Sequence, residues 1–230
     1  MKKYELTTET LQFAGRTLHR IKAVRDFGSV KAGEFGGWIE NEKNLSQDDN
    51  AWIYGEAMAI GNARVFGNAK ILGNAHIFGN AKVFDSARVY DDARVYDDAI
   101  VHNNARIYDN AIVSDYAEVC ENAKVCDDAD VYGLTRIFGN AKIFGNATIK
   151  GNAKVHDDID YIVFKNFWSS GRYFTWTRSN NKWSVGCFYG TGEELIKKAY
   201  ADSVKSGREY ERVVRYVESI LADEKKEKSN

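Results

Sequence analysis

The feature that most constrains this chain is a six-residue repeat that runs without insertion from Ala51 to Asp158, making eighteen hexads. The first hexad position is Ala except at Thr135, and the third is Ile or Val except at Ala59. Alternate residues of a strand point the same way, so each hexad gives one face a small and a β-branched side chain. The fifth and sixth positions are mostly Gly, Asp or Asn, which tolerate bends and positive φ. Each hexad is therefore predicted to be a short strand followed by a bend.

The six-residue period excludes two common folds. An α-helix fails because its 3.6-residue turn does not divide six, so the apolar pair would wander around the axis. A meander fails because strands this short pair poorly with their sequence neighbours. Stacking each strand on the coils before and after it satisfies the backbone, as in a parallel β-helix. The hexads resemble those of the hexapeptide-repeat family of left-handed parallel β-helices. That resemblance implies a mainly β protein with three hexads per triangular coil, six to seven coils, and assembly as a trimer.

The residues before the repeat are expected to close one end of the β-helix, which spans 51–158. Residues 1–50 form the N-terminal cap in this interpretation. Within them, 37–50 is an irregular first coil and 1–36 is a lid. A lid is needed because a bare end exposes unpaired backbone groups and invites another molecule to stack on them.

The residues after the repeat, 159–230, are predicted to form a small α+β module. Their first part carries three aromatic segments that read as strands, with a β-hairpin turn at Ser179-Asn180-Asn181. Thr191 and Glu194 have the spacing of a capping box, which predicts the start of a helix. A second helix is expected from about 207 to 222, because its apolar residues recur on one face.

Composition bounds the function more loosely. The formal net charge of -1 excludes a uniformly basic nucleic-acid-binding protein but says nothing of local patches. No segment approaches the length of a membrane span, and Lys2 and Lys3 are not followed by the apolar run of a secretory signal. The three cysteines are odd in number and not spaced like metal ligands. We therefore expect no membrane, no metal, no cofactor and a location in the cytoplasm of a bacterial host.

One wall of the predicted prism carries a column of cations. The second position of every third hexad falls on this wall and holds Lys70, Arg88, Arg106, Lys124 and Lys142 in succession. Such a column is unusual, because like charges at coil spacing repel. Aromatic residues lie beside it, and together they can hold phosphates by charge and rings by stacking. The predicted ligand-binding residues of this wall are Lys70, Arg88, Arg106, Lys124, Tyr90 and Tyr108.

The column has a purely structural alternative. Acidic residues at the bends, such as Asp91 and Asp109, can neutralise the cations within the protomer or across an oligomer. The outward aromatic ladders likewise have two interpretations, packing between protomers or stacking along their own wall.

The C-terminal module offers a second candidate set, Arg172, Trp176, Arg178 and Trp183, around a hairpin. A helix N-terminus preceded by Gly190-Thr191-Gly192 follows this set, and helix N-termini attract anions. Tryptophan-rich small sheets are also often simple cores. These residues are therefore predicted either to bind ligand or to build the core and the oligomer.

Two further segments carry a resemblance. GRTLHRIKAVRDFGSVKAGEFGGWIE near the start and WSVGCFYGTGEEL near the end are similar to segments of phage and prophage hexapeptide-repeat proteins. The resemblance implies a viral or mobile-element origin. We expect a non-catalytic, oligomeric binding protein that captures an anionic, nucleotide-like ligand between protomers to counter a host defence signal. Docking on a host protein through the same wall is the second hypothesis.

An acyltransferase is the third hypothesis, because that enzyme class is the one most associated with this fold. Those enzymes generally carry a loop that protrudes from a coil and a catalytic His near the subunit boundary. No hexad is interrupted in this chain, and His76, His102 and His156 all stand at outward positions. His102 and His156 lie three coils apart, too far to share a metal. We therefore predict no catalytic residue, and keep acyl transfer by His76 or His102 as the alternative.

Overall fold

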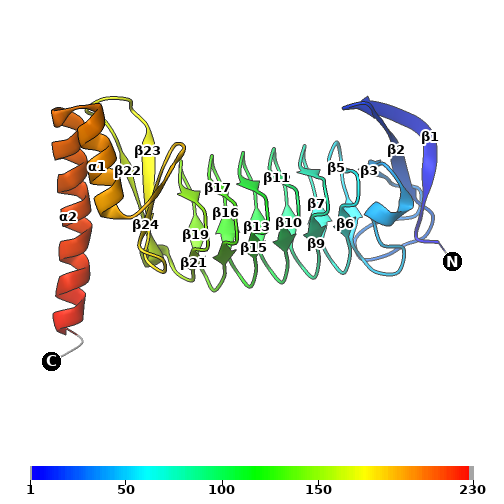
Figure 1. Cartoon of the computed structure of the whole chain (residues 1–230). Coiled ribbons are helices and arrows are strands. Elements are labelled where there is room, and N and C mark those ends of the chain that lie inside the picture. The colour runs from blue at the N-terminus through cyan, green and yellow to red at the C-terminus, as the bar shows by residue number, and fades with distance from the viewer. Residues whose placement is uncertain (1, 228–230) are drawn as a thin grey trace. The chain divides into compact units, whose positions relative to one another are not determined.

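The computed structural model describes residues 2–227, and these form two compact units that divide between Asp160 and Tyr161. Unit 1 is a left-handed parallel β-helix of about seven coils, preceded by an antiparallel cap. Figure 1 shows the coils of this unit following one another along a common axis. The predicted fold class is therefore confirmed.

Each hexad contributes one two-residue strand to one of three parallel walls. The β4 wall contains β4 (Trp52–Ile53), β7 (Lys70–Ile71), β10 (Arg88–Val89), β13 (Arg106–Ile107), β16 (Lys124–Val125) and β19 (Lys142–Ile143). The β5 wall contains β5 (Met58–Ala59), β8 (His76–Ile77), β11 (Arg94–Val95), β14 (Ile112–Val113), β17 (Asp130–Val131) and β20 (Thr148–Ile149). The β6 wall contains β6 (Arg64–Val65), β9 (Lys82–Val83), β12 (Ile100–Val101), β15 (Glu118–Val119), β18 (Arg136–Ile137) and β21 (Lys154–Val155).

The interior of the β-helix is built from the inward pair that the repeat predicts. First and third hexad positions are at most 1% exposed along the whole repeat. Strands pair with residues eighteen positions away, so Val89 lies between Ile71 and Ile107. Ala at the first position lets the three walls approach, and each buried Val or Ile contributes on the order of 1.5–3 kcal/mol.

The backbone conformation at the corners of the β-helix explains why Gly, Asp and Asn recur at the fifth hexad position. Every fifth hexad position from Gly55 to Gly151 has positive φ, whether the residue is glycine or not. Gly73, with φ of 64°, and Asp91, with φ of 57°, occupy successive coils at one corner. Gly has no Cβ to clash there, and Asp and Asn tolerate this conformation better than most residues. Gly, Asp and Asn therefore alternate freely at the corners.

The cap is an antiparallel hairpin that continues into the β-helix. It contains β1 (Tyr4–Phe13) and β2 (Arg16–Ala23), followed by β3 (Phe35–Ile39) and the 3-10 helix η1 (Glu42–Asn44). β3 pairs in parallel with β5, so the β5 wall extends to nine strands. A Cβ on Gly37 would lie 2.3 Å from the Ala57 carbonyl oxygen, so only glycine permits this close approach.

The end of the β-helix is sealed by buried polar contacts from the cap. The Lys3 ammonium donates to the carbonyl oxygens of Asp49 and Ala51, at 3.0 and 2.9 Å. Burial lowers the pKa of Lys3 to about 8, and nearby Asp49 partly offsets this effect. The ring of Tyr4 packs edge-on against Trp52, with centroids 6.0 Å apart. These contacts satisfy terminal backbone groups that a bare end would expose.

Unit 2 is a four-stranded antiparallel sheet packed against a helix pair. Its elements are β22 (Tyr161–Lys165), β23 (Tyr173–Thr177), β24 (Lys182–Val185), β25 (Phe188–Gly190), α1 (Gly192–Asp202) and α2 (Val204–Glu227). The capping box predicted at Thr191 and Glu194 is present. None of the helices in residues 2–227 combines the length and the hydropathy of a membrane-spanning segment.

The second helix extends beyond the predicted range of 207–222 at both ends, since α2 spans Val204–Glu227. Its C-terminal extension consists of Asp, Glu and Lys, and all but Asp are good helix formers. The helix was predicted from the spacing of its apolar residues, and the C-terminal extension has no apolar residues. The prediction therefore ended before the helix does.

We expect Val95→Asp to unfold the central coils, because Val95 is fully buried and a carboxylate there has no partner. The destabilisation should exceed about 3 kcal/mol. Thermal melts followed by far-ultraviolet circular dichroism measure it, with Lys82→Asp on the exposed surface of the β6 wall as the control. A wild-type melt of Val95→Asp would contradict the inward assignment.

Candidate functional site

The predicted column of cations is present on the β4 wall. Arg88 pairs in register with Lys70 on one side and Arg106 on the other, and Arg106 pairs with Lys124. Strand spacing places these second-position residues about 4.8 Å apart along the axis. We call Lys70, Arg88, Arg106 and Lys124 the basic column. A shallow pocket of about 310 Å³ lies between Arg88, Arg106 and Tyr90.

No residue of the basic column forms an ion pair within residues 2–227. Arg88, Arg106 and Lys124 are exposed, and Lys70 is half-buried. Repulsion between stacked like charges raises the free energy of the folded chain. An anion bound along the wall would remove that cost.

The acidic residues at the adjacent corner bind the backbone instead. The carboxylate of Asp91 accepts from the Asp109 amide at 3.4 Å, and that of Asp109 accepts from the Asp127 amide at 3.2 Å. The Asp127 carboxylate accepts from the Gly145 amide at 2.8 Å. These side chains link successive coils, so the predicted alternative of direct ion pairing with the column is not realised within the described protomer.

The tyrosines of this wall stack on each other. The rings of Tyr90 and Tyr108 lie 5.0 Å apart and 2° from parallel. Leu72 precedes them and Cys126 follows them at the same hexad position, and the neighbouring Cys126 thiol raises the pKa of Tyr108. Their faces are therefore directed along the column rather than outward. The wall offers cations and ring edges to a ligand, which suits phosphate groups better than base stacking.

Most of the candidate residues in the C-terminal module already contact other residues of unit 2. Trp176 and Trp183 are 1% and 2% exposed and belong to its hydrophobic core. Arg178 makes two hydrogen bonds to the Glu224 carboxylate, at 2.6 and 3.1 Å. Arg172 lines a separate cavity beside Tyr210. This placement favours the core interpretation for the two tryptophans, and it gives Arg178 a partner in the Glu224 carboxylate.

A larger groove was missed by sequence reasoning. It has a volume of about 650 Å³ and lies where the tip of the β1–β2 hairpin faces the β5 wall. Phe13 from the hairpin packs edge-on against His76, with ring centroids 5.2 Å apart. Phe78, Ile60 and Arg94 also line the groove. The hairpin reaches a His that the repeat alone places on an open wall, and no local signal in residues 1–36 indicates that contact.

The environment of this groove lowers the pKa of His76. Burial lowers the pKa of its imidazole, and the neighbouring Arg94 guanidinium lowers it further, against a smaller opposite effect of Asp92. Arg94 forms no ion pair within residues 2–227. A neutral imidazole in an apolar groove can accept a proton, and a nearby unpaired guanidinium can bind an anionic group.

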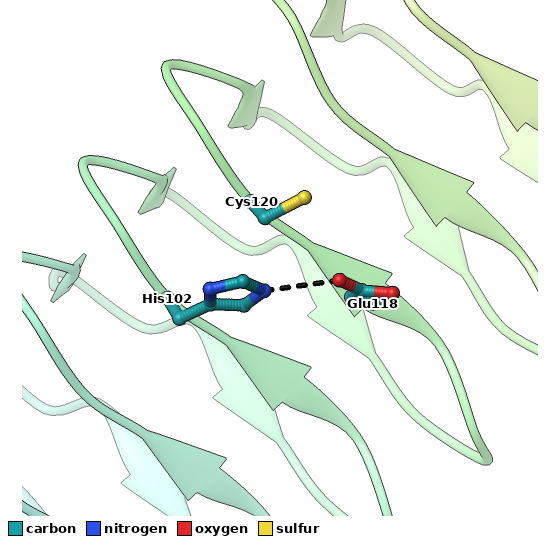
Figure 2. A group of neighbouring side chains, drawn as sticks. All are labelled: His102, Glu118 and Cys120. Carbon is teal, nitrogen blue, oxygen red and sulfur yellow. Dashed lines mark hydrogen bonds and ion pairs between the residues drawn. The ribbon is translucent and has the colours of Figure 1, made fainter.

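A third cluster lies on the β6 wall. Figure 2 shows His102, Glu118 and Cys120 with their side chains close together, and the His102 imidazole hydrogen-bonds the Glu118 carboxylate at 3.0 Å. Cys120 and Cys126 are buried although both stand at outward hexad positions. Burial raises the pKa of the Cys120 thiol, so it is not an activated nucleophile.

Comparison with known proteins supports the β-helix and little more. The model of the YdcK beta solenoid repeat matches residues 87–103 and 105–121. An Escherichia coli K12 protein described as "Uncharacterized acetyltransferase YdcK" is 39% identical over 64 residues, covering 24% of this chain. The match spans 20% of that protein's length. The chain is thus similar to a hexapeptide-type β-solenoid protein over part of the repeat.

We expect the imidazole of His76 to titrate below the ordinary pKa of about 6.5. Because its pKa is lowered on folding, its contribution to stability is present above the unfolded pKa and is lost as pH falls below it. Arg94→Gln should raise the pKa by removing a repulsive charge, and Phe13→Ala should raise it by admitting water. Two-dimensional NMR titration of the His resonances measures these shifts. An ordinary pKa that neither variant moves would contradict the proposed environment.

Proposed function

We propose that the protein binds an anionic, phosphate-bearing ligand along the basic column of the β4 wall, without catalysing a reaction on it. The observation that carries this proposal is a register of four cations that have no acidic partner within the described protomer. The corner carboxylates are hydrogen-bonded to the next coil. These carboxylates keep their charge, and Asp91 borders the pocket, but none forms an ion pair with the column among the described residues, which leaves direct contact with the cations to solvent ions, another protein or a ligand.

The pocket between Arg88, Arg106 and Tyr90 is the centre of this proposed site. Two guanidinium groups one coil apart can grip phosphate oxygens with paired hydrogen bonds. The ring of Tyr90 borders the same pocket, together with the Asp91 carboxylate. We infer that the phosphates carry most of the binding energy, and that a nucleoside, where present, lies across the ring edges.

The finer parts of the sequence interpretation stay predictions. A phage origin, a trimer and a role against a host defence signal have no support from the comparisons. Docking of a host protein on the same wall remains the alternative to a small ligand, and an acidic protein surface would use the same cations.

We expect at least one of ATP, a cyclic dinucleotide and linear polyphosphate to bind with measurable heat in calorimetric titration. Arg88→Glu with Arg106→Glu should weaken that binding at least about 100-fold, because each charge-assisted hydrogen bond contributes roughly 1.5–3 kcal/mol. The matched control is Arg64→Glu with Lys82→Glu, which reverses two cations on the β6 wall.

The absence of heat with all three probes would contradict a phosphate-bearing ligand. Equal loss in the control pair would show that only the overall charge matters, and would contradict a site at Arg88 and Arg106. Melting curves of both double variants establish that each remains folded.

Acetyl transfer in the His76 groove is the second candidate function. It is favoured by a His with a lowered pKa in a groove of about 650 Å³ and by the partial similarity to a protein described as an acetyltransferase. In this mechanism His76 accepts a proton from an amine or hydroxyl acceptor, whose lone pair attacks the thioester carbonyl of acetyl-CoA. The CoA thiolate leaves and takes up a proton, while Arg94 binds a phosphate of the same molecule.

We expect His76→Asn to abolish release of free CoA thiol from acetyl-CoA in the presence of spermidine, glucosamine or a lysine peptide. Binding of acetyl-CoA should persist, because the variant keeps the shape of the groove. His156→Asn, at an exposed position outside the groove, is the control. Failure of the wild-type protein to bind acetyl-CoA would exclude this candidate without affecting the basic column.

A further inference from the structure

Three potential metal ligands converge on the β6 wall. His102 and Cys120 occupy the same hexad position on successive coils, and Glu118 lies two residues before Cys120. One ligand atom from each of the three residues lies within 4.8 Å of the other two. In Figure 2 the imidazole, the carboxylate and the thiol lie next to one another.

We propose that His102, Glu118 and Cys120 bind a zinc ion. An imidazole nitrogen, a carboxylate oxygen and a thiolate form a donor set that suits Zn²⁺ and excludes Mg²⁺ and Ca²⁺, which prefer oxygen ligands. Zinc–ligand bonds of about 2.0–2.3 Å set ligand atoms roughly 3.3–3.8 Å apart in a tetrahedron. Small side-chain rotations bring the present separations into that range, and solvent completes the fourth position.

The surrounding side chains hold these ligands in place. The His102 ring stacks on Phe84, with centroids 4.9 Å apart and planes 10° from parallel. Its Nδ1 lies 3.8 Å from the Asp85 carboxylate, so Asp85 can accept the Nδ1 proton when Nε2 binds metal. Arg136 lies 3.5 Å from the second oxygen of Glu118 and fixes the carboxylate. His–carboxylate support of this kind is general in metal sites.

Charge also balances at this site. The metal displaces the proton of the Cys120 thiol to solvent, and the imidazole proton moves from Nε2 to Nδ1. The thiolate, Glu118 and Asp85 then carry three negative charges, which balance the positive charges of Zn²⁺ and Arg136. The side chains of His102 and Glu118 are 20% and 34% exposed, which leaves a path for the ion. Bound zinc would connect adjacent coils and stabilise the β-helix.

A second group of potential ligands consists of Asp109, Cys126 and Asp127, whose ligand atoms lie equally close together. This group is the comparison for the proposed site. It lacks an imidazole, and its carboxylates already accept backbone hydrogen bonds from the next coil. The Cys126 thiol is buried, and burial raises its pKa. We therefore assign no metal to it.

The test uses the full chain with Cys187→Ser, because Cys187 is exposed and can bind metal nonspecifically. Co²⁺ is added as the probe and the thiolate-to-metal charge-transfer band is followed, after which Zn²⁺ is added to displace it. We expect saturation at one ion per chain. Cys120→Ser should abolish the band, and His102→Gln should weaken binding at least about 10-fold. Asp85→Asn should weaken it roughly 10- to 100-fold, while Cys126→Ser should change nothing.

Zinc should also raise the melting temperature of the parent protein and not that of His102→Gln. His102→Gln keeps a polar side chain at a partly exposed position, so it stays informative if Cys120→Ser fails to fold. Absence of the charge-transfer band, equal loss in Cys126→Ser, or zinc affinity unchanged in both Cys120→Ser and His102→Gln would overturn the proposal.

Discussion

The structure depends on the stacking of an Ala and a β-branched residue in register at every coil. This inward pair supplies the buried apolar surface, and its regular spacing lets each strand bond to the coil on either side. The coil can close only because every corner accepts positive φ. Six-residue units without insertion satisfy both conditions at once, so the interior leaves almost no freedom to the backbone.

A consequence of this regularity is that outward side chains form columns. Each residue of the repeat lies beside the residue eighteen positions away. Outward residues at the same hexad position of successive coils therefore form a column along the axis of the β-helix. The column of cations on the β4 wall and the cluster of His102, Glu118 and Cys120 both arise in this way. At the corners the same stacking joins Asp91, Asp109 and Asp127 into a ladder that serves the backbone. A polar side chain on this β-helix thus stabilises the fold where it can bond to a backbone amide, and is available to bind a ligand where it cannot.

The chemistry of the candidate sites follows from that distinction. Cations of the basic column lie above a wall whose amides and carbonyls already bond to each other, so their charges stay available. The rings beside them stack along the axis, which removes their faces from ligand contact. His76, like Trp52 and Met58, is an outward residue over which a segment outside the repeat packs. The cap thus both seals the end of the β-helix and forms the wall of a groove.

The repeat by itself determined the β-helix, the inward pair, the turn residues and the membership of each column, because a period of six admits one solution for the backbone. It could not tell that the corner carboxylates would bond to backbone amides, since that depends on distances of a few tenths of an ångström. Cysteine spacing along the chain likewise gave no sign of the ligand cluster at Cys120, because its His partner is eighteen residues away and adjacent only through coil stacking. The groove at His76 was decided by tertiary structure alone, because Phe13 approaches through a hairpin whose docking leaves no periodic signal in the sequence.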